Sequence, residues 1–344
     1  MKILIAGLIV CSGLHLSAQD VHFSQTAETP LLINPGATGV YGGWERIQIN
    51  HRNQWLGANT QFMTSSLACD VNFFKSQRND KAHIGLGMFF YNDIGGDSNF
   101  GTQSGAVSIS GIIPMAGGGH SLSAGLQGGF GMRSGNLDRV VFESQISGNA
   151  FNPAIPSGES ANLNNYRYLD VSTGIFYQYD SERSSFARSN PVKLQLGGAL
   201  YHVNNPTFQF DGVAGGRLYR KFVLHSSYSQ DIVDTKFAFD ASFVQFIQGP
   251  HYETILGGMI RHRFQNGTKY TGFTRDAYLG VGVYMRVKDA IIPRILIDWK
   301  GLKVGISYDV TISRLSRAHK GGSLEFSLAY TNMQYALFKR RRNK

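Results

Sequence analysis

The segment LKVGISYDVTI, residues 302–312, indicates the fold class because its apolar and polar residues alternate without interruption. Every second residue is apolar: Leu302, Val304, Ile306, Tyr308, Val310 and Ile312. The residues between them are polar or glycine: Lys303, Gly305, Ser307, Asp309 and Thr311. Successive side chains of a β-strand point to opposite faces, so the segment predicts a strand with one apolar and one polar face.

The same alternation recurs along most of the chain, between clusters of Gly, Pro, Asn, Asp and Ser that end each run. The predicted strands are 44–53, 61–74, 82–92, 100–113, 120–132, 166–179, 191–202, 219–230, 236–248, 251–264, 277–288, 290–299, 302–312 and 322–335. Each is long enough to cross a membrane as a tilted strand of about 9–11 residues. The sequence therefore predicts an all-β chain with about fourteen antiparallel strands.

The composition favours a transmembrane barrel over a soluble β-sandwich, which is the alternative fold for alternating strands. Glycine makes up 41 of 344 residues, and charged residues make up only 16%. Glycine and serine fill the polar faces, where a water-facing sheet would carry more Lys and Glu. The strands also exceed the length of about 5–6 residues that is typical of sandwiches. Aromatic residues gather at strand ends, for example at 89–91, 176–179 and Trp299, as in the girdles of outer-membrane barrels.

The N-terminus has the features of a secretory signal peptide over residues 1–18. Met1 and Lys2 give a positive start, residues 3–10 are apolar, and Ala18 ends a small-residue cleavage site. Cys11 raises a lipoprotein alternative, which the bulky Val10 before it disfavours. No later stretch has the roughly 18 apolar residues of a membrane helix, so a membrane protein with this sequence must be a closed barrel. We expect an exported, multi-pass barrel of the outer membrane.

Residues 19–43 precede the first strand and lack its alternation, and they contain Pro30 and Pro35. We expect this segment to fold into the lumen as a plug or to cap the periplasmic mouth, because irregular backbone at membrane depth must be buried in protein. A flexible periplasmic tail is the alternative. The apolar residues Phe23 and 31–33 argue against that tail.

An even number of strands would place both ends of the barrel, residues 44–338, in the periplasm. The longest connections, 133–165 and 203–218, would then be extracellular, as expected for barrels with long outer loops and short inner turns. Residues 339–344 form a basic tail, KRRRNK, that would be periplasmic and could meet an acidic partner or lipid headgroups. A plain solvated end is the alternative for this tail.

Charged residues of the first and closing strands are expected to share one wall of the lumen. Arg46 and Arg52 lie on the polar face of the first strand. The closing strands add Arg286, Lys288, Arg294, Asp298, Lys303, Asp309 and Glu325. Because the first and last strands adjoin in a closed barrel, we hypothesise an ion-pair network that fixes strand register and holds the plug. The alternative is a set of scattered charges that keeps the lumen wet.

The sequence contains no motif for catalysis, metal binding or nucleic-acid binding. Its ten histidines include no HExxH pair, and no GxSxG motif occurs. The run 92–99 could suggest a weak calcium site, but its spacing fits no EF-hand, and a turn is the better interpretation. The formal charge of +10 is dispersed, which disfavours nucleic acid as a partner. We therefore expect no enzyme, no metal and no cofactor.

Residues 20–57, DVHFSQTAETPLLINPGATGVYGGWERIQINHRNQWLG, resemble the opening of the PorP/SprF family of the Bacteroidota type IX secretion system and gliding machinery. The matching elements include Phe23-Ser24-Gln25, Asn34-Pro35 and Arg52-Asn53-Gln54-Trp55. The far end is similar to the family's closing pattern at 289–293, 305–310 and 321–325. Gly36 and the basic tail depart from the family, which usually has alanine at the former position.

The resemblance implies an outer-membrane barrel without enzymatic activity. Such proteins support export or surface anchoring of a large adhesin through its C-terminal sorting domain, and they contact periplasmic secretion and gliding components. Residues expected to bind the partner or to form the plug and lumen are Phe23, Asn34, Pro35, Arg52, Asn53, Gln54, Trp55 and Asp309. Outer-membrane lipid would surround the barrel. The alternative function is a passive channel or a transporter of hydrophobic solutes.

Overall fold

The computed structural model describes residues 20–54, 62–76, 81–96, 98–115, 118–135, 140–147, 150–152, 154–156, 158, 166–181, 191–207, 216–265, 276–313 and 321–333. The predicted signal peptide (1–18), Trp55 and the basic tail (339–344) lie outside these residues.

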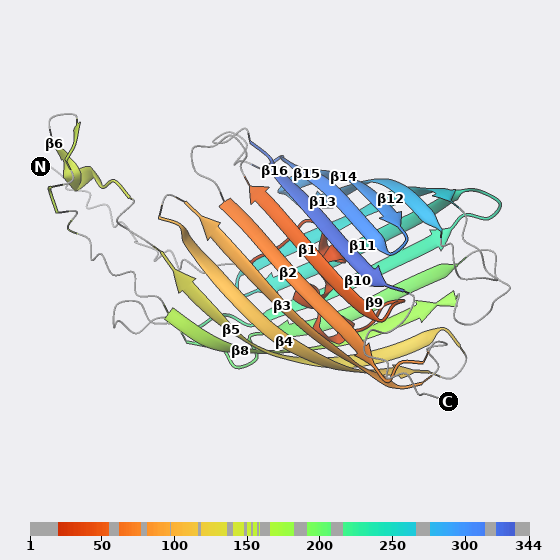
Figure 1. Ribbon diagram of the computed structural model, residues 1–344. Coiled ribbons are helices and arrows are strands. Elements are labelled where there is room, and N and C mark those ends of the chain that lie inside the picture. The colour runs from red at the N-terminus through yellow and green to blue at the C-terminus, as the bar shows by residue number, and fades with distance from the viewer. Residues whose placement is uncertain are drawn as a thin grey trace, which may run out of the picture.

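Fourteen strands of the described chain form one closed antiparallel barrel (Figure 1). They are β1 (Glu45–Gln54), β2 (Phe62–Phe73), β3 (His83–Gly95), β4 (Phe100–Pro114), β5 (His120–Ser134), β8 (Tyr166–Asp180), β9 (Val192–Tyr201), β10 (Lys221–Asp231), β11 (Phe237–Gln248), β12 (His251–Gln265), β13 (Ala277–Arg286), β14 (Ala290–Trp299), β15 (Leu302–Thr311) and β16 (Ser323–Asn332). Neighbours in sequence pair with one another, and β1 pairs with β16 to close the barrel. The fold class predicted from alternation is confirmed, and each predicted strand overlaps one observed strand.

The two faces of each strand are reversed relative to a water-soluble protein. In β15 the apolar residues Ile306 and Val310 are exposed on the outside, whereas Ser307 and Asp309 are buried in the lumen. An apolar exterior suits lipid, which cannot hydrogen-bond to polar side chains. Among the described residues, no helix has the length and apolar character needed to span a bilayer.

Two short strands lie outside the barrel, in the long connection between β5 and β8. β6 (Ile146–Ser147) and β7 (Ala150–Phe151) pair as a small hairpin after the 3₁₀ helix η4 (Glu143–Gln145). This hairpin projects away from the barrel in Figure 1.

The N-terminal residues 20–43, called the plug from here on, are folded inside the barrel (Figure 1, red). They form three short helices: η1 (Thr26–Glu28), α1 (Pro30–Ile33) and η2 (Pro35–Ala37). Proline at the first position suits the start of a helix, because its missing N–H would have no partner there. Residues 20–43 therefore fold into the lumen and do not merely cap one mouth of the barrel.

Three clusters of buried apolar residues join the plug to the barrel wall, and a fourth consists of wall residues alone. Leu31 packs with Ala68 and Phe89, and Ile33 belongs to a cluster with Tyr201 and Val223. In the described part of the chain, most of the hydrophobic core therefore lies between the plug and the lumen side of the strands.

The plug runs from one mouth of the barrel to the other. We call the mouth where β1 begins and β16 ends the terminal mouth, and the opposite one the far mouth. At the terminal mouth, Tyr41 donates a hydrogen bond from its hydroxyl to the Asp70 carbonyl (2.7 Å). At the far mouth, Asp20 lies 2.7 Å from His202, which follows the end of β9. The segment therefore extends along the whole lumen.

Candidate functional site: the plug and the lumen wall

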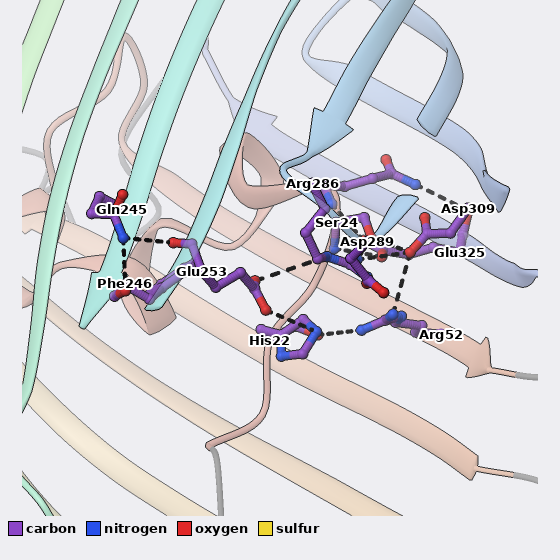
Figure 2. Close-up of polar contacts among 11 residues, drawn as sticks. His22, Ser24, Arg52, Gln245, Phe246, Glu253, Arg286, Asp289, Asp309 and Glu325 are labelled. Carbon is purple, nitrogen blue, oxygen red and sulfur yellow. Dashed lines mark hydrogen bonds and ion pairs between the residues drawn. The ribbon is translucent and has the colours of Figure 1, made fainter. Parts of the chain in front are cut away.

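Asp309 joins the plug to two strands of the wall (Figure 2). Its Oδ2 atom accepts hydrogen bonds from Ser24 Oγ (2.7 Å), Arg286 Nη2 (2.7 Å) and Arg52 Nη2 (3.2 Å). Ser24 belongs to the plug, and the two arginines come from β13 and β1. Asp309 is only 1% exposed, so two cations of the wall and one residue of the plug share a single buried carboxylate.

Glu325 of β16 binds the backbone of the plug. Its carboxylate oxygens accept hydrogen bonds from the amides of Ser24 (2.7 Å) and Gln25 (2.8 Å), and the residue is fully buried. In the register of the closing strand pair, Glu325 stands opposite Arg52 of β1. The plug is therefore attached at the seam where the first and last strands close the barrel.

The Gln25 side chain forms hydrogen bonds with the same seam from inside the lumen. Its amide nitrogen donates to the Glu325 carbonyl (3.0 Å) and to Ser307 Oγ (3.1 Å), while its oxygen accepts from Ser327 Oγ (2.7 Å). A buried amide whose donors and acceptor are paired specifies one position for the plug, because any shift leaves polar atoms unsatisfied.

A second ion pair lies near the middle of the plug. Arg294 Nη2 of β14 donates to Glu28 Oε1 at 2.6 Å, and both side chains are buried. This ion pair ties the middle of the plug to the wall.

Asn34 fixes the turn between α1 and η2. Its Oδ1 accepts from the Gly36 amide (2.7 Å), and its Nδ2 donates to the Ile175 carbonyl (2.8 Å) and contacts His225 Nε2 (3.0 Å). A Cβ atom at Gly174 would collide with the Asn34 amide. Glycine at this position of β8 thus lets the plug approach the wall closely.

Asp70 of β2 binds the plug and Arg46 at the terminal mouth. It accepts two hydrogen bonds from Arg46, at 2.9 and 2.7 Å, and one from the Gly39 amide at 2.9 Å. The Arg46 guanidinium also lies 4.3 Å from the centre of the Tyr41 ring. Burial, reinforced by the Asp70 charge, raises the pKa of the Tyr41 hydroxyl well above its usual range, so Tyr41 remains a hydrogen-bond donor.

His202 clasps the plug at the far mouth. Its Nε2 lies 2.7 Å from Asp20 Oδ2, and its Nδ1 lies 2.8 Å from Asp170 Oδ1. Carboxylates only accept hydrogen bonds, so both ring nitrogens must carry protons and the ring is an imidazolium. Burial by itself would lower the pKa of His202, but the charge of Asp20 and the hydrogen bonds of both carboxylates outweigh burial and raise the pKa to about 10.

The expected site residues have different environments. Phe23 is 3% exposed in the plug, Asn34 and Pro35 form the turn just described, and Arg52 meets Asp309 directly. Asn53 and Gln54 extend β1 at the far mouth, opposite Leu324 and Ser323.

Several of the charged residues expected on the wall form ion pairs, but Glu325 binds backbone amides and Lys288 is exposed in the turn between β13 and β14. Arg52, Arg286, Arg294, Asp309 and Glu325 all contact the plug. Lys303 instead pairs with Asp298 at 3.6 Å, within the wall. Sequence reasoning missed Asp20, Glu28, Asp70 and His202. Asp70 carried one usable signal, because it lies on the polar face of its strand.

Two small clefts flank the plug's first residues at the far mouth. One is lined by Asp20, His22, Phe246, His251, Tyr252 and Glu253. The other is lined by Val21, Tyr91, Asp93, Arg133, Tyr168 and Leu218. Within the described part of the chain, no group of three His, Cys, Asp or Glu side chains is placed to hold a metal ion.

Solved structures similar to the chain are bacterial outer-membrane barrels. The toluene transporter TbuX of Ralstonia pickettii shares 9% identity, with a TM-score of 0.49 over 90% of this chain and 94% of that one. BamA of Haemophilus ducreyi, lacking POTRA domains 1–3, gives 9% identity and a TM-score of 0.43 over 84% and 70%. The translocator domain of the autotransporter NalP from Neisseria meningitidis shares 9% identity, with a TM-score of 0.39 over 89% of this chain and 96% of that one.

Sequence comparison is more specific than these structural likenesses. The profile of the family described as "Type IX secretion system membrane protein PorP/SprF" matches residues 15–330. Among curated proteins, no sequence is significantly similar to the chain. The closed barrel and the family match both support an outer-membrane location.

Proposed function

Because the chain belongs to the PorP/SprF family of type IX secretion system membrane proteins, we propose that it supports export and surface anchoring of a large secreted adhesin. The adhesin would be held through its C-terminal sorting domain. The barrel would also link that adhesin to periplasmic components of the secretion and gliding apparatus. This role requires no catalytic group and no cofactor.

The observation that carries the proposal is the plug, which is bonded to the wall along its whole length. Asp70 holds it at the terminal mouth, Arg294 in the middle, and Glu325 and Asp309 toward the far mouth. A solute crossing the lumen would have to break buried ion pairs, and removing one partner of such a pair costs about 3–5 kcal/mol. A filled, rigid barrel suits the docking of a macromolecule better than diffusion of a solute.

The test is purification of the tagged chain from native outer membranes after mild cross-linking. We expect a large exported protein to co-purify through its C-terminal domain, together with periplasmic secretion components. A matched preparation of an unrelated barrel of similar size controls for nonspecific capture. Recovery of the chain without any exported protein would contradict the proposal.

The channel alternative makes an opposite prediction in planar lipid bilayers. If the plug remains seated, the purified barrel should be electrically silent. Steady conductance of the intact chain, with no partner bound, would favour a passive channel or solute transporter over an anchor.

A further inference from the structure

The contacts of the plug follow a strict order along the barrel axis. Near residue 40 its contacts are with Asp70, close to the end of β2 at the terminal mouth. At Ser24 and Gln25 they are with Glu325, close to the start of β16 at the far mouth. At Asp20 they are with His202 and Lys221, which border the connection between β9 and β10.

We propose that the far mouth is the surface that docks the exported partner, and that residues 20–22, the first residues of the plug, form part of this surface. The inference rests on the proposed function for the identity of the partner. The placement of residues 20–22 rests on the contacts above and on the sidedness of barrels.

The loops indicate which side of the membrane the far mouth faces. The two longest connections between barrel strands, from β5 to β8 and from β9 to β10, both leave the barrel there. Outer-membrane barrels have their longer loops outside the cell and their short turns in the periplasm. The far mouth is therefore extracellular. The plug carries the first residues of the folded chain across the membrane, away from the side where β1 begins.

The first residues of the plug are held firmly at this mouth. Asp20 contacts the His202 ring, its amide donates to Gln248 Oε1 (3.2 Å), and Lys221 lies 3.5 Å from its carboxylate. His22 is also bonded to the wall, because Arg52 Nη1 donates a hydrogen bond to its carbonyl at 3.0 Å. The Nε2 atom of its ring lies 3.5 Å from Glu253 Oε2, and the two side chains face each other in Figure 2. These residues form a fixed part of the surface.

The cleft beside Val21 has the chemistry to accept a basic side chain. Asp93 lies in it with Tyr91 and Tyr168. The Asp93 carboxylate accepts a hydrogen bond from Thr64, and Arg133 is directed to Thr102 and lies over the Phe100 ring. A carboxylate attracts a cation. We infer that a lysine or arginine of the partner contacts Asp93 at this cleft.

Cysteine labelling on intact cells tests the placement. In a chain with Cys11→Ala and Cys69→Ala, we compare Val21→Cys at the far mouth with Gly42→Cys at the terminal mouth. A Cβ at Gly42 meets no atom within 4 Å, so this control is tolerated. In cells lacking the exported partner, a membrane-impermeant maleimide should label V21C on intact cells and G42C only after permeabilisation. The reverse pattern, or labelling of both only after permeabilisation, would overturn the placement.

The docking surface is tested separately from the proposed function. Restoring the exported partner should protect V21C from the maleimide, and Asp93→Asn should weaken capture of the partner by about tenfold. Asp234→Asn, an exposed carboxylate in the β10–β11 turn at the terminal mouth, should leave capture unchanged. If the partner co-purifies but neither protects V21C nor depends on Asp93, the docking surface is elsewhere. If no partner co-purifies, the proposed function itself fails.

Discussion

Arg52 and Glu325 stand opposite each other across the seam between β1 and β16, and both are buried. Glu325 does not bind the arginine in front of it; its two oxygens receive the amides of Ser24 and Gln25, while Arg52 reaches Asp309. The residues at the seam that closes the barrel are thus also the residues that bind the plug.

Replacing Glu325 with glutamine should therefore weaken both the seam and the plug. The amide keeps one acceptor but turns an NH₂ group toward a backbone N–H, which leaves a buried donor unsatisfied. We expect a loss of about 1–3 kcal/mol in the free energy of unfolding. The readout is urea unfolding in detergent micelles. An unchanged midpoint would show that the two amide contacts do not stabilise the fold.

Asp309→Asn should be more damaging, because it leaves two buried arginines with less negative charge. Loss of one partner from a buried ion pair costs about 3–5 kcal/mol. The folded barrel should convert to the slow-migrating form at a lower temperature on heat-modifiability gels. Asp298→Asn is the matched control, since its partner Lys303 is half exposed and such pairs contribute about 0–1 kcal/mol. Equal gel behaviour of the two variants would exclude a special role for Asp309.

The His202 clasp should give a pH-dependent stability at the far mouth. Its pKa is about 10 in the folded chain and 6.5 in the reference state, so the folded state binds the proton more tightly. The stabilisation is complete below pH 6.5 and is lost as the pH rises toward about 10. Asp20 and Asp170 face the ring, and Lys221 lies 3.5 Å from the Asp20 carboxylate.

The variant for this experiment is His202→Asn, because His202 has a φ of 57° and asparagine tolerates that left-handed conformation. The wild type should be more stable than the variant at pH 6, and the difference should vanish near pH 10. A difference independent of pH would mean that the protonated ring is not what holds Asp20. At low pH a further loss is expected, because burial opposes ionisation of Asp20 but the His202 and Lys221 charges hold its pKa below its usual value.

Adding one methyl group to the wall should dislodge the plug. At Gly174→Ala the new Cβ would overlap the Asn34 amide, and overpacking of this kind costs about 1–3 kcal/mol. We expect lower thermal stability and measurable conductance in planar bilayers. Gly128→Ala in β5 is the control, since a Cβ there meets no atom within 4 Å. A silent and fully stable G174A barrel would show that the plug adjusts without cost.

The alternation of side chains was sufficient to predict the barrel, because strand periodicity is a local property of the sequence. The wall charges Arg52 and Asp309 could also be predicted, since polar faces of a closed barrel must turn inward. The partners of the plug could not. His202 follows a strand end and lies 182 residues from Asp20, with nothing in the local pattern to connect them. Their contact depends on the path of an irregular segment, and alternation carries no information about that path.

The attachment of the plug at the seam dictates the order in which the chain can be assembled. Ser24 is among the first residues made and Glu325 among the last, at a sequence separation of 301. The seat for Ser24 does not exist until β16 has arrived beside β1. The plug can therefore take its final position only when the barrel has closed. A chain that ended before β16 would lack the Glu325 carboxylate that binds Ser24 and Gln25, even with the other thirteen strands paired.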